Sequence, residues 1–102
     1  MPAERRVVRV TPDFFDSLDE QLSSDRGPRG EPSATDFLVL ELPSVVEHFA
    51  AGFSELPEIV DGFSAARMFI GRGKLVRAFA VYGLLMADGC VDLIGIEIDL
   101  GT

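Results

Sequence analysis

The stretch that decides the fold is residues 66–100, ARMFIGRGKLVRAFAVYGLLMADGCVDLIGIEIDL. Turn residues divide it at 71–74 and again at Asp88-Gly89. Asp-Gly between apolar runs favours a two-residue type I′ hairpin turn, which needs positive φ at both central positions. We therefore predict an antiparallel meander of three strands, at residues 66–70, 75–87 and 90–100.

The residues of the last two strands suggest how their faces are used. Ile94, Ile96, Ile98 and Leu100 alternate with Gly95, Glu97 and Asp99. This period of two predicts a half-buried strand with the isoleucines on its buried face. The middle strand is apolar on both faces after Arg77, which suits a central strand that is covered on both sides or has a partner on its outer face.

Composition limits the class of protein. The 102 residues are 47% hydrophobic, which predicts one domain over 1–102 with a single core. The net charge of −8 opposes nucleic-acid binding except at a local basic patch. Such a patch is conceivable because nine Lys and Arg residues gather in three places, at residues 5–9, 26–29 and 67–77.

Site chemistry and location follow from what the sequence contains. With one cysteine, Cys90, and one histidine, His48, we expect no disulfide, no zinc site and no cofactor. Neither residue has a partner at a spacing that indicates a catalytic triad. We find no signal-peptide pattern and no apolar run of the roughly 20 residues that a membrane helix needs, so we expect a cytoplasmic protein.

The first 35 residues predict a strand, a helix and a loop. Val8 and Val10 alternate as in a strand, with both valines inward. Thr11 then offers an N-cap, followed by Pro12 and Asp13 in the first helical turn. One apolar stripe marks the helix, at Phe14, Leu18 and Leu22. Residues 23–35 contain two Gly and two Pro without apolar periodicity, and predict a long loop, a kind of segment that is often functional or mobile.

Residues 36–56 allow two interpretations. Leu38, Leu42, Val45, Phe49 and Phe53 are spaced by three or four, as in a helix. Pro43 would break or kink that helix near residues 42–44, because proline has no amide hydrogen to donate, and Ser44 could cap a new start. The alternative is a short strand over residues 37–42 followed by one helix. We favour the helix, because the stripe runs through the proline in register.

The resulting fold class is α+β. It comprises a strand, two helices and a three-stranded antiparallel meander (βααβββ), with a single layer of helices on an antiparallel sheet. Four segments within this order stand out, VRVTP at 8–12, FSELPE at 53–58, ARMFI at 66–70 and RAFAVY at 77–82. In this order of elements and in these segments, the chain resembles the RelE/ParE superfamily of toxin-antitoxin toxins.

The resemblance implies a function and a set of site residues. Relatives of RelE cut mRNA on the ribosome, and relatives of ParE poison DNA gyrase. The strand positions that match place Arg67, Arg77 and Tyr82 in the catalytic role, with Arg72 and Lys74 in the adjoining turn binding substrate. The implied partner is an antitoxin protein, and the ribosome or a nucleic acid would be the target.

The last strand departs from the pattern of that family. It presents Asp92, Glu97 and Asp99 instead of Arg, His or Tyr, and carboxylates repel phosphate. The alternative is therefore an inactive binding or dimerisation module of the same fold. Its contact surface would lie on the middle strand, on Phe79 and Val81 or on Ala80 and Tyr82, depending on which face the helices cover. An unrelated small α+β protein is the third hypothesis.

Overall fold

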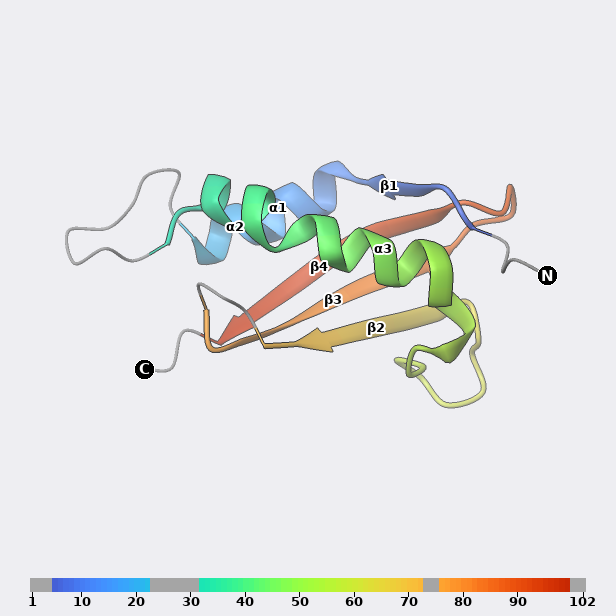
Figure 1. Cartoon of the computed structure of the whole chain (residues 1–102). Helices are drawn as coiled ribbons and strands as arrows, with labels where there is room; N and C mark the ends of the chain where they lie inside the picture. Colours follow the sequence, from blue (N-terminus) through green and yellow to red (C-terminus); the bar gives the residue numbers. More distant parts are fainter. Residues whose placement is uncertain (1–4, 23–31, 73–75, 100–102) are drawn as a thin grey trace.

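The protein has an α+β fold, and its described residues form three α-helices and a four-stranded mixed sheet (Figure 1). The structure is a computed structural model and describes residues 5–22, 32–72 and 76–99. Its elements, in chain order, are β1 (Val8–Val10), α1 (Pro12–Gln21), α2 (Ala34–Leu40), α3 (Leu42–Gly52), a 3₁₀ turn (Phe53–Glu55), β2 (Ala66–Gly71), β3 (Ala78–Leu85) and β4 (Val91–Asp99). The predicted class and the C-terminal meander are confirmed, but the sequence interpretation missed one helix.

The first helix begins as the sequence predicts. The Thr11 side chain accepts a hydrogen bond from the Phe14 amide, and Pro12 occupies the first turn. Phe14, Leu18 and Leu22 are all buried, so the predicted stripe is the core face of α1. Of the predicted 23–35 loop, residues 23–31 lie outside the described residues, and 33–35 belong to the capping box and first turn of α2.

Residues 34–52 form two helices, so the strand proposed for 37–42 is wrong. The break falls at Glu41, and the two helical segments are bent by 48°. Pro43 lies in the first turn of α3, where its missing amide hydrogen costs no helical bond. The new helix begins two residues before Ser44, and Glu41 provides no side-chain cap. The bend lets Phe37 of α2 and Phe49 of α3 both reach the core.

The sheet order is β1-β4-β3-β2, and β1 runs parallel to β4. The prediction of an entirely antiparallel sheet is therefore wrong for this one pair. A parallel pair needs a long connection, which residues 11–90 supply, and strand periodicity carries no information about pairing direction. Val8 and Val10 pack against the core, as predicted.

A β-bulge changes the faces of β4. Tyr82 pairs with Gly95 but Gly83 pairs with Leu93, which leaves Ile94 as the extra residue. Val91, Leu93 and Ile96 are buried, whereas Ile94 is exposed. The predicted placement of Ile94 with the buried isoleucines is therefore wrong, because an extra residue shifts the period of two by one position.

The turn between β3 and β4 differs from the predicted type I′ turn. The Gly89 amide bonds to the Met86 carbonyl, and only Gly89 has positive φ, at 89°. Asp88 instead accepts a hydrogen bond from the Cys90 amide through its side chain. The hairpin is present, but with a longer connection that places only its glycine in the left-handed region. Strand β3, Ala78–Leu85, is also shorter than predicted, because residues 76–77 and 86–87 are not part of it, and the predicted start at residue 75 lies outside the described residues.

Helix α1 lies along the edge of β4 that β1 leaves open, because β1 pairs only with Val91–Leu93. The Ser17 hydroxyl donates to the Ile96 carbonyl at 2.8 Å, and the Gln21 amide nitrogen donates to the same carbonyl at 2.6 Å. The Gln21 side-chain oxygen accepts from the Ile98 amide at 2.7 Å. Two helical side chains thus satisfy backbone groups that a neighbouring strand would otherwise pair.

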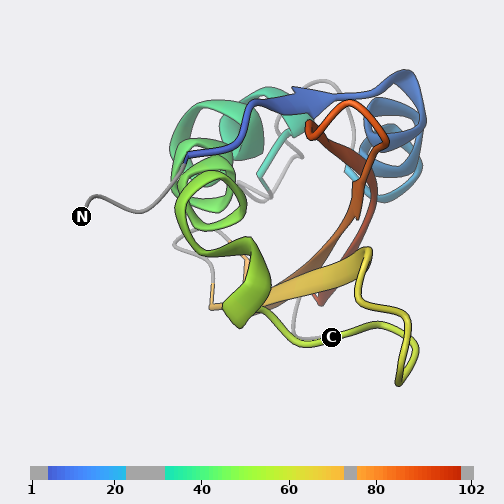
Figure 2. The same cartoon turned by 90° about the vertical axis from the view of Figure 1, so that its right-hand side faces the viewer.

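The core fills the space between the sheet and the helices. Phe49 packs over Gly83 of β3, and Phe37 makes an edge contact with Phe79 at 5.2 Å between ring centroids. Figure 2 looks almost along the strands and shows α2 and α3 on one side of the sheet, with α1 beside β4. The opposite side of β2 and β3 bears no helix of the described chain.

Candidate functional site

Arg67, the first of the predicted catalytic residues, is held by backbone groups. Its side chain is 14% exposed, and its guanidinium donates to the carbonyls of Ser64 at 2.8 Å, Leu56 at 2.7 Å and Ser54 at 3.3 Å. The carboxylate of Glu58 lies at 3.7 Å. These contacts tie the 3₁₀ turn and the following loop to β2, which is a structural role for the guanidinium.

Tyr82 lies on the other face of the sheet. Arg67 pairs with Gly83, and Tyr82 pairs with the next residue, Met68, so strand alternation points Arg67 and Tyr82 to opposite sides. Burial raises the pKa of the Tyr82 hydroxyl, and its hydrogen bond to Glu97 raises this pKa further. The phenol is therefore a poor acid at neutral pH, which is a property of a hydrogen-bonded surface group and not of an activated base.

The remaining predicted residues do not join either of these two. Arg77 precedes β3 with its side chain 71% exposed, 3.9 Å from Asp99. Arg72 is exposed at the end of β2, beside a hollow that Glu41 also lines. Lys74 lies outside the described residues. The structure thus separates Arg67 from Tyr82 by the sheet itself, and it brings no two of the described residues of this set, Arg67, Arg72, Arg77 and Tyr82, into hydrogen-bonding contact.

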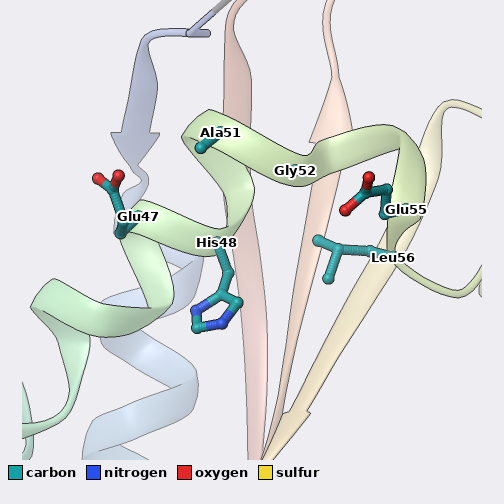
Figure 3. Close-up of a pocket in the computed structure, with 6 residues that line it drawn as sticks. All are labelled: Glu47, His48, Ala51, Gly52, Glu55 and Leu56. Atoms are coloured by element: carbon teal, nitrogen blue, oxygen red, sulfur yellow. The ribbon is translucent and has the colours of Figure 1, made fainter. Parts of the chain in front are cut away.

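A groove of about 420 Å³ runs along the exposed side of α3 and the 3₁₀ turn (Figure 3). His48 forms one wall, with its Nδ1 2.8 Å from the Ser44 carbonyl and its ring 4.4 Å from that of Phe69. The side chains of Glu55 and Leu56 lie across from it, whereas Glu47 points away and pairs with Arg5. The described residues that line the groove carry no hydroxyl, thiol or amine, so none of them offers a nucleophile that His48 could activate.

A metal site is not indicated either. Among residues 5–22, 32–72 and 76–99, no group of three or more His, Cys, Asp or Glu side chains is arranged to hold a metal ion. The groove beside His48 therefore offers shape and one ring nitrogen, but no catalytic constellation.

The side of the sheet away from α2 and α3, which we call the outer face, has a different character. On β2 and β3 this face is formed by alanines, larger apolar side chains and one tyrosine, whose hydroxyl is its one polar side-chain group. The residues are Ala66, Met68, Ile70, Ala78, Ala80, Tyr82 and Leu84. An antiparallel sheet face in contact with water ordinarily alternates to polar side chains. Here the outer positions of two adjacent strands carry no charge.

The outer face is hollowed at one end. Ala78 and Ala80 form the floor of a depression of about 260 Å³, with Ile70 on one side and Glu97 and Asp99 on the other. Ile70 is 62% exposed. The small floor residues leave room for an incoming apolar side chain at this position.

Carboxylates border the outer face along β4 and α1. Glu97 pairs with Ala80 and Asp92 with Leu84, so both lie on this face. Helical geometry places three exposed carboxylates of α1 opposite its buried stripe, those of Asp13, Asp16 and Glu20. The guanidinium of Arg9 offsets part of this negative charge, because it forms ion pairs with the carboxylates of Asp92, at 2.6 Å, and Asp88, at 2.9 Å. We call the carboxylates of Asp92, Glu97, Asp13, Asp16 and Glu20 the acidic border.

The loop before β2 borders the other side. Residues 57–65 extend past β2 on the side away from α3 (Figure 2). The loop is anchored by hydrogen bonds from the Ile59 amide to Ala66 and from the Met68 amide to Pro57. It exposes three large apolar side chains, those of Ile59, Val60 and Phe63. The outer face therefore has one acidic side and one apolar side.

Comparison with known proteins adds no relative. No family model, curated protein or solved structure matches this chain. No single helix within the described ranges is long and apolar enough to cross a membrane; α2 and the segment Leu42–Glu55 pass that test together, by length and composition only. The resemblance to RelE/ParE toxins stays a prediction.

The sequence analysis named part of the outer face. It left open whether Phe79 and Val81 or Ala80 and Tyr82 would be outward, and the structure buries the first pair under the helices. It did not name Met68 and Ile70 of β2, although their spacing of two is the signal that would have shown a second uncharged strand face.

Proposed function

We propose that this chain is a non-catalytic protein-binding domain and that the outer face of its sheet is the docking surface. The observation that carries the proposal is the uncharged surface of β2 and β3, on the side that bears no helix of the described residues. Burying such a surface against a partner removes apolar area from water, at roughly 25 cal/mol per Å².

The placement of the basic residues supports binding over catalysis. Phosphoryl-transfer chemistry on RNA would need cations and an acid or base converging on one site. Arg67 is engaged by three carbonyls, and Tyr82 bonds to a carboxylate on the opposite face. The competing hypothesis is a toxin that acts on translation or gyrase and has an antitoxin as its partner, and the growth experiment below tests it. We also propose a cytoplasmic location.

The docking surface can be tested by site-specific photo-crosslinking in cells. A photoreactive phenylalanine analogue replaces Ala80 on the outer face or, as a matched control, exposed Ala51 on α3. We expect discrete adducts from position 80 that are absent from position 51 and are lost when Ile70→Asp is added. Adducts that are the same from both positions, or none from position 80, would contradict the proposal.

Growth after induction of the chain alone in a bacterial culture tests the competing activity. We expect growth to continue at high expression. Because Arg67 ties a loop to β2, its substitution would confuse loss of folding with loss of activity, so Arg77→Ala and Tyr82→Phe are the better variants. Growth arrest that either variant relieves would favour the toxin hypothesis and overturn the binding proposal.

A further inference from the structure

We propose that the segment bound by the outer face is a cationic amphipathic helix, with an apolar stripe on β2 and β3 and its Lys or Arg side chains beside the acidic border. The inference rests on the proposed function, since it names the partner class for the same surface. Two properties of that surface carry it, the asymmetry of its borders and its length.

The borders select the charge of the partner. Glu97 and the carboxylates of α1 lie along one side of the outer face, and the sequence of α1, PDFFDSLDEQ, contains no Lys or Arg. The opposite side exposes Ile59, Val60 and Phe63. A partner helix therefore meets negative charge on one flank and apolar side chains on the other. Complementary charge on the partner steers association and fixes orientation.

The length of the surface suits a helix. Strand β3 has eight residues, which at about 3.3 Å per residue gives a surface roughly 26 Å long. A helix of that length has about 17 residues, at 1.5 Å of rise per residue. Helices packed on both sides of a sheet are a common layer arrangement. The hollow above Ala78 and Ala80, next to exposed Ile70, accepts one apolar anchor of such a helix.

Charge also argues against other occupants. A second copy of the chain would add another net charge of −8 and bring the same acidic border into the interface. Nucleic acids and anionic membrane surfaces are repelled by the same carboxylates. A positively charged protein segment is the occupant that this arrangement attracts.

Two synthetic peptides of 18 residues test the inference with the full chain. Both have the same Leu and Ala stripe, and the polar positions are lysine in one and glutamate in the other. In fluorescence anisotropy we expect the lysine peptide to bind at least about tenfold more tightly, with the difference shrinking as salt is raised from about 0.05 to 0.5 M. Equal affinities, or no binding of the lysine peptide, would overturn the inference.

Variants separate docking from mere charge attraction. Glu97→Gln removes one carboxylate of the acidic border, and Glu55→Gln removes an exposed one beside the groove on α3. We expect the first to weaken binding of the lysine peptide by about three- to tenfold and the second to leave it unchanged. Ile70→Asp adds a negative charge, so it should strengthen non-specific attraction but weaken a docked helix. Stronger binding to Ile70→Asp would contradict the inference.

The two levels of the proposal fail in different ways. If crosslinks from position 80 are specific but the lysine peptide does not bind, the docking surface stands and the cationic helix is wrong. If sedimentation shows a dimer that Ile70→Asp converts to a monomer, a second copy is the occupant and the inference is overturned. If position 80 gives no specific adduct, the docking surface itself is wrong.

Discussion

Gly83 is the position at which a single added methyl group should have the clearest effect on stability. It lies at a buried position of β3, directly under the ring of Phe49 from α3. A Cβ built at Gly83 would meet Cε1 and Cδ1 of Phe49, the latter at 2.8 Å. The ring is fully buried, so it has no free space to occupy when displaced.

The expected cost of Gly83→Ala combines two opposing effects. Overpacking of a dense core costs roughly 1–3 kcal/mol. Replacing glycine by alanine restricts the unfolded chain and returns about 0.4–1 kcal/mol. The difference spans roughly 0–2.6 kcal/mol. Because the fully buried Phe49 ring has no free space to move into, we expect a net loss of about 1–2 kcal/mol, which for a domain of this size lowers Tm by roughly 4–16 °C.

The matched control is the same substitution at Gly95, on β4. A Cβ there would meet Tyr82 at 3.6 Å, which is an ordinary contact, and Gly95 does not have positive φ. Gly95→Ala should therefore leave stability unchanged or raise it by up to about 1 kcal/mol. Urea unfolding of both variants, followed by circular dichroism, gives the two free energies of unfolding.

A second-site change tests the cause. If the Phe49 ring is the obstacle, Phe49→Leu should tolerate Gly83→Ala better than the wild type does, so the two changes should be non-additive. A Gly83→Ala variant within about 0.5 kcal/mol of the wild type, a range typical of surface substitutions, would refute the packing argument. Equal losses at Gly83 and Gly95 would refute it as well.

Three further predictions concern polar contacts. Gln21→Ala removes the side chain that bonds to the Ile96 carbonyl and the Ile98 amide. We expect it to lower the free energy of unfolding by about 1–2 kcal/mol and to speed amide exchange at Ile98. Unchanged exchange would contradict the edge-covering role of α1. Arg67→Ala should lower the free energy of unfolding by about 2 kcal/mol and increase proteolysis within residues 57–65, because it removes the hydrogen bonds to the Ser64 and Leu56 carbonyls. A cleavage rate equal to that of the wild type would show that other contacts hold the loop. Tyr82 is the only tyrosine, so the phenolate absorbance should titrate above its usual pKa of 10.0, and Glu97→Gln should lower the midpoint. Because the pKa of Tyr82 is higher in the folded than in the unfolded chain, the stability that its protonated hydroxyl contributes is fully present below pH 10 and is lost as pH rises through the folded-state pKa. A titration midpoint at or below 10.0 would refute the raised pKa.

The sequence by itself determined the local elements. The cap at Thr11 and the stripe of Phe14, Leu18 and Leu22 specified α1, because capping and helical spacing depend on residues within a few positions of one another. The helix break around Pro43 follows from the missing amide hydrogen. The three-strand meander follows from apolar runs separated by glycine-containing turns.

Only the tertiary structure decided which residues meet. Strand periodicity does not encode pairing direction, so the parallel β1–β4 pair was invisible in the sequence. A bulge depends on the register between two strands, and it moved Ile94 from the buried to the exposed face. Ser17 and Gln21 bond to residues 75 or more positions away. The separation of Arg67 from Tyr82 follows from strand alternation and the β2–β3 register. The uncharged outer positions of β2 and β3 bear no helix of the described residues because α2 and α3 pack on the other side, and this packing is set by long-range burial and not by local residue preference.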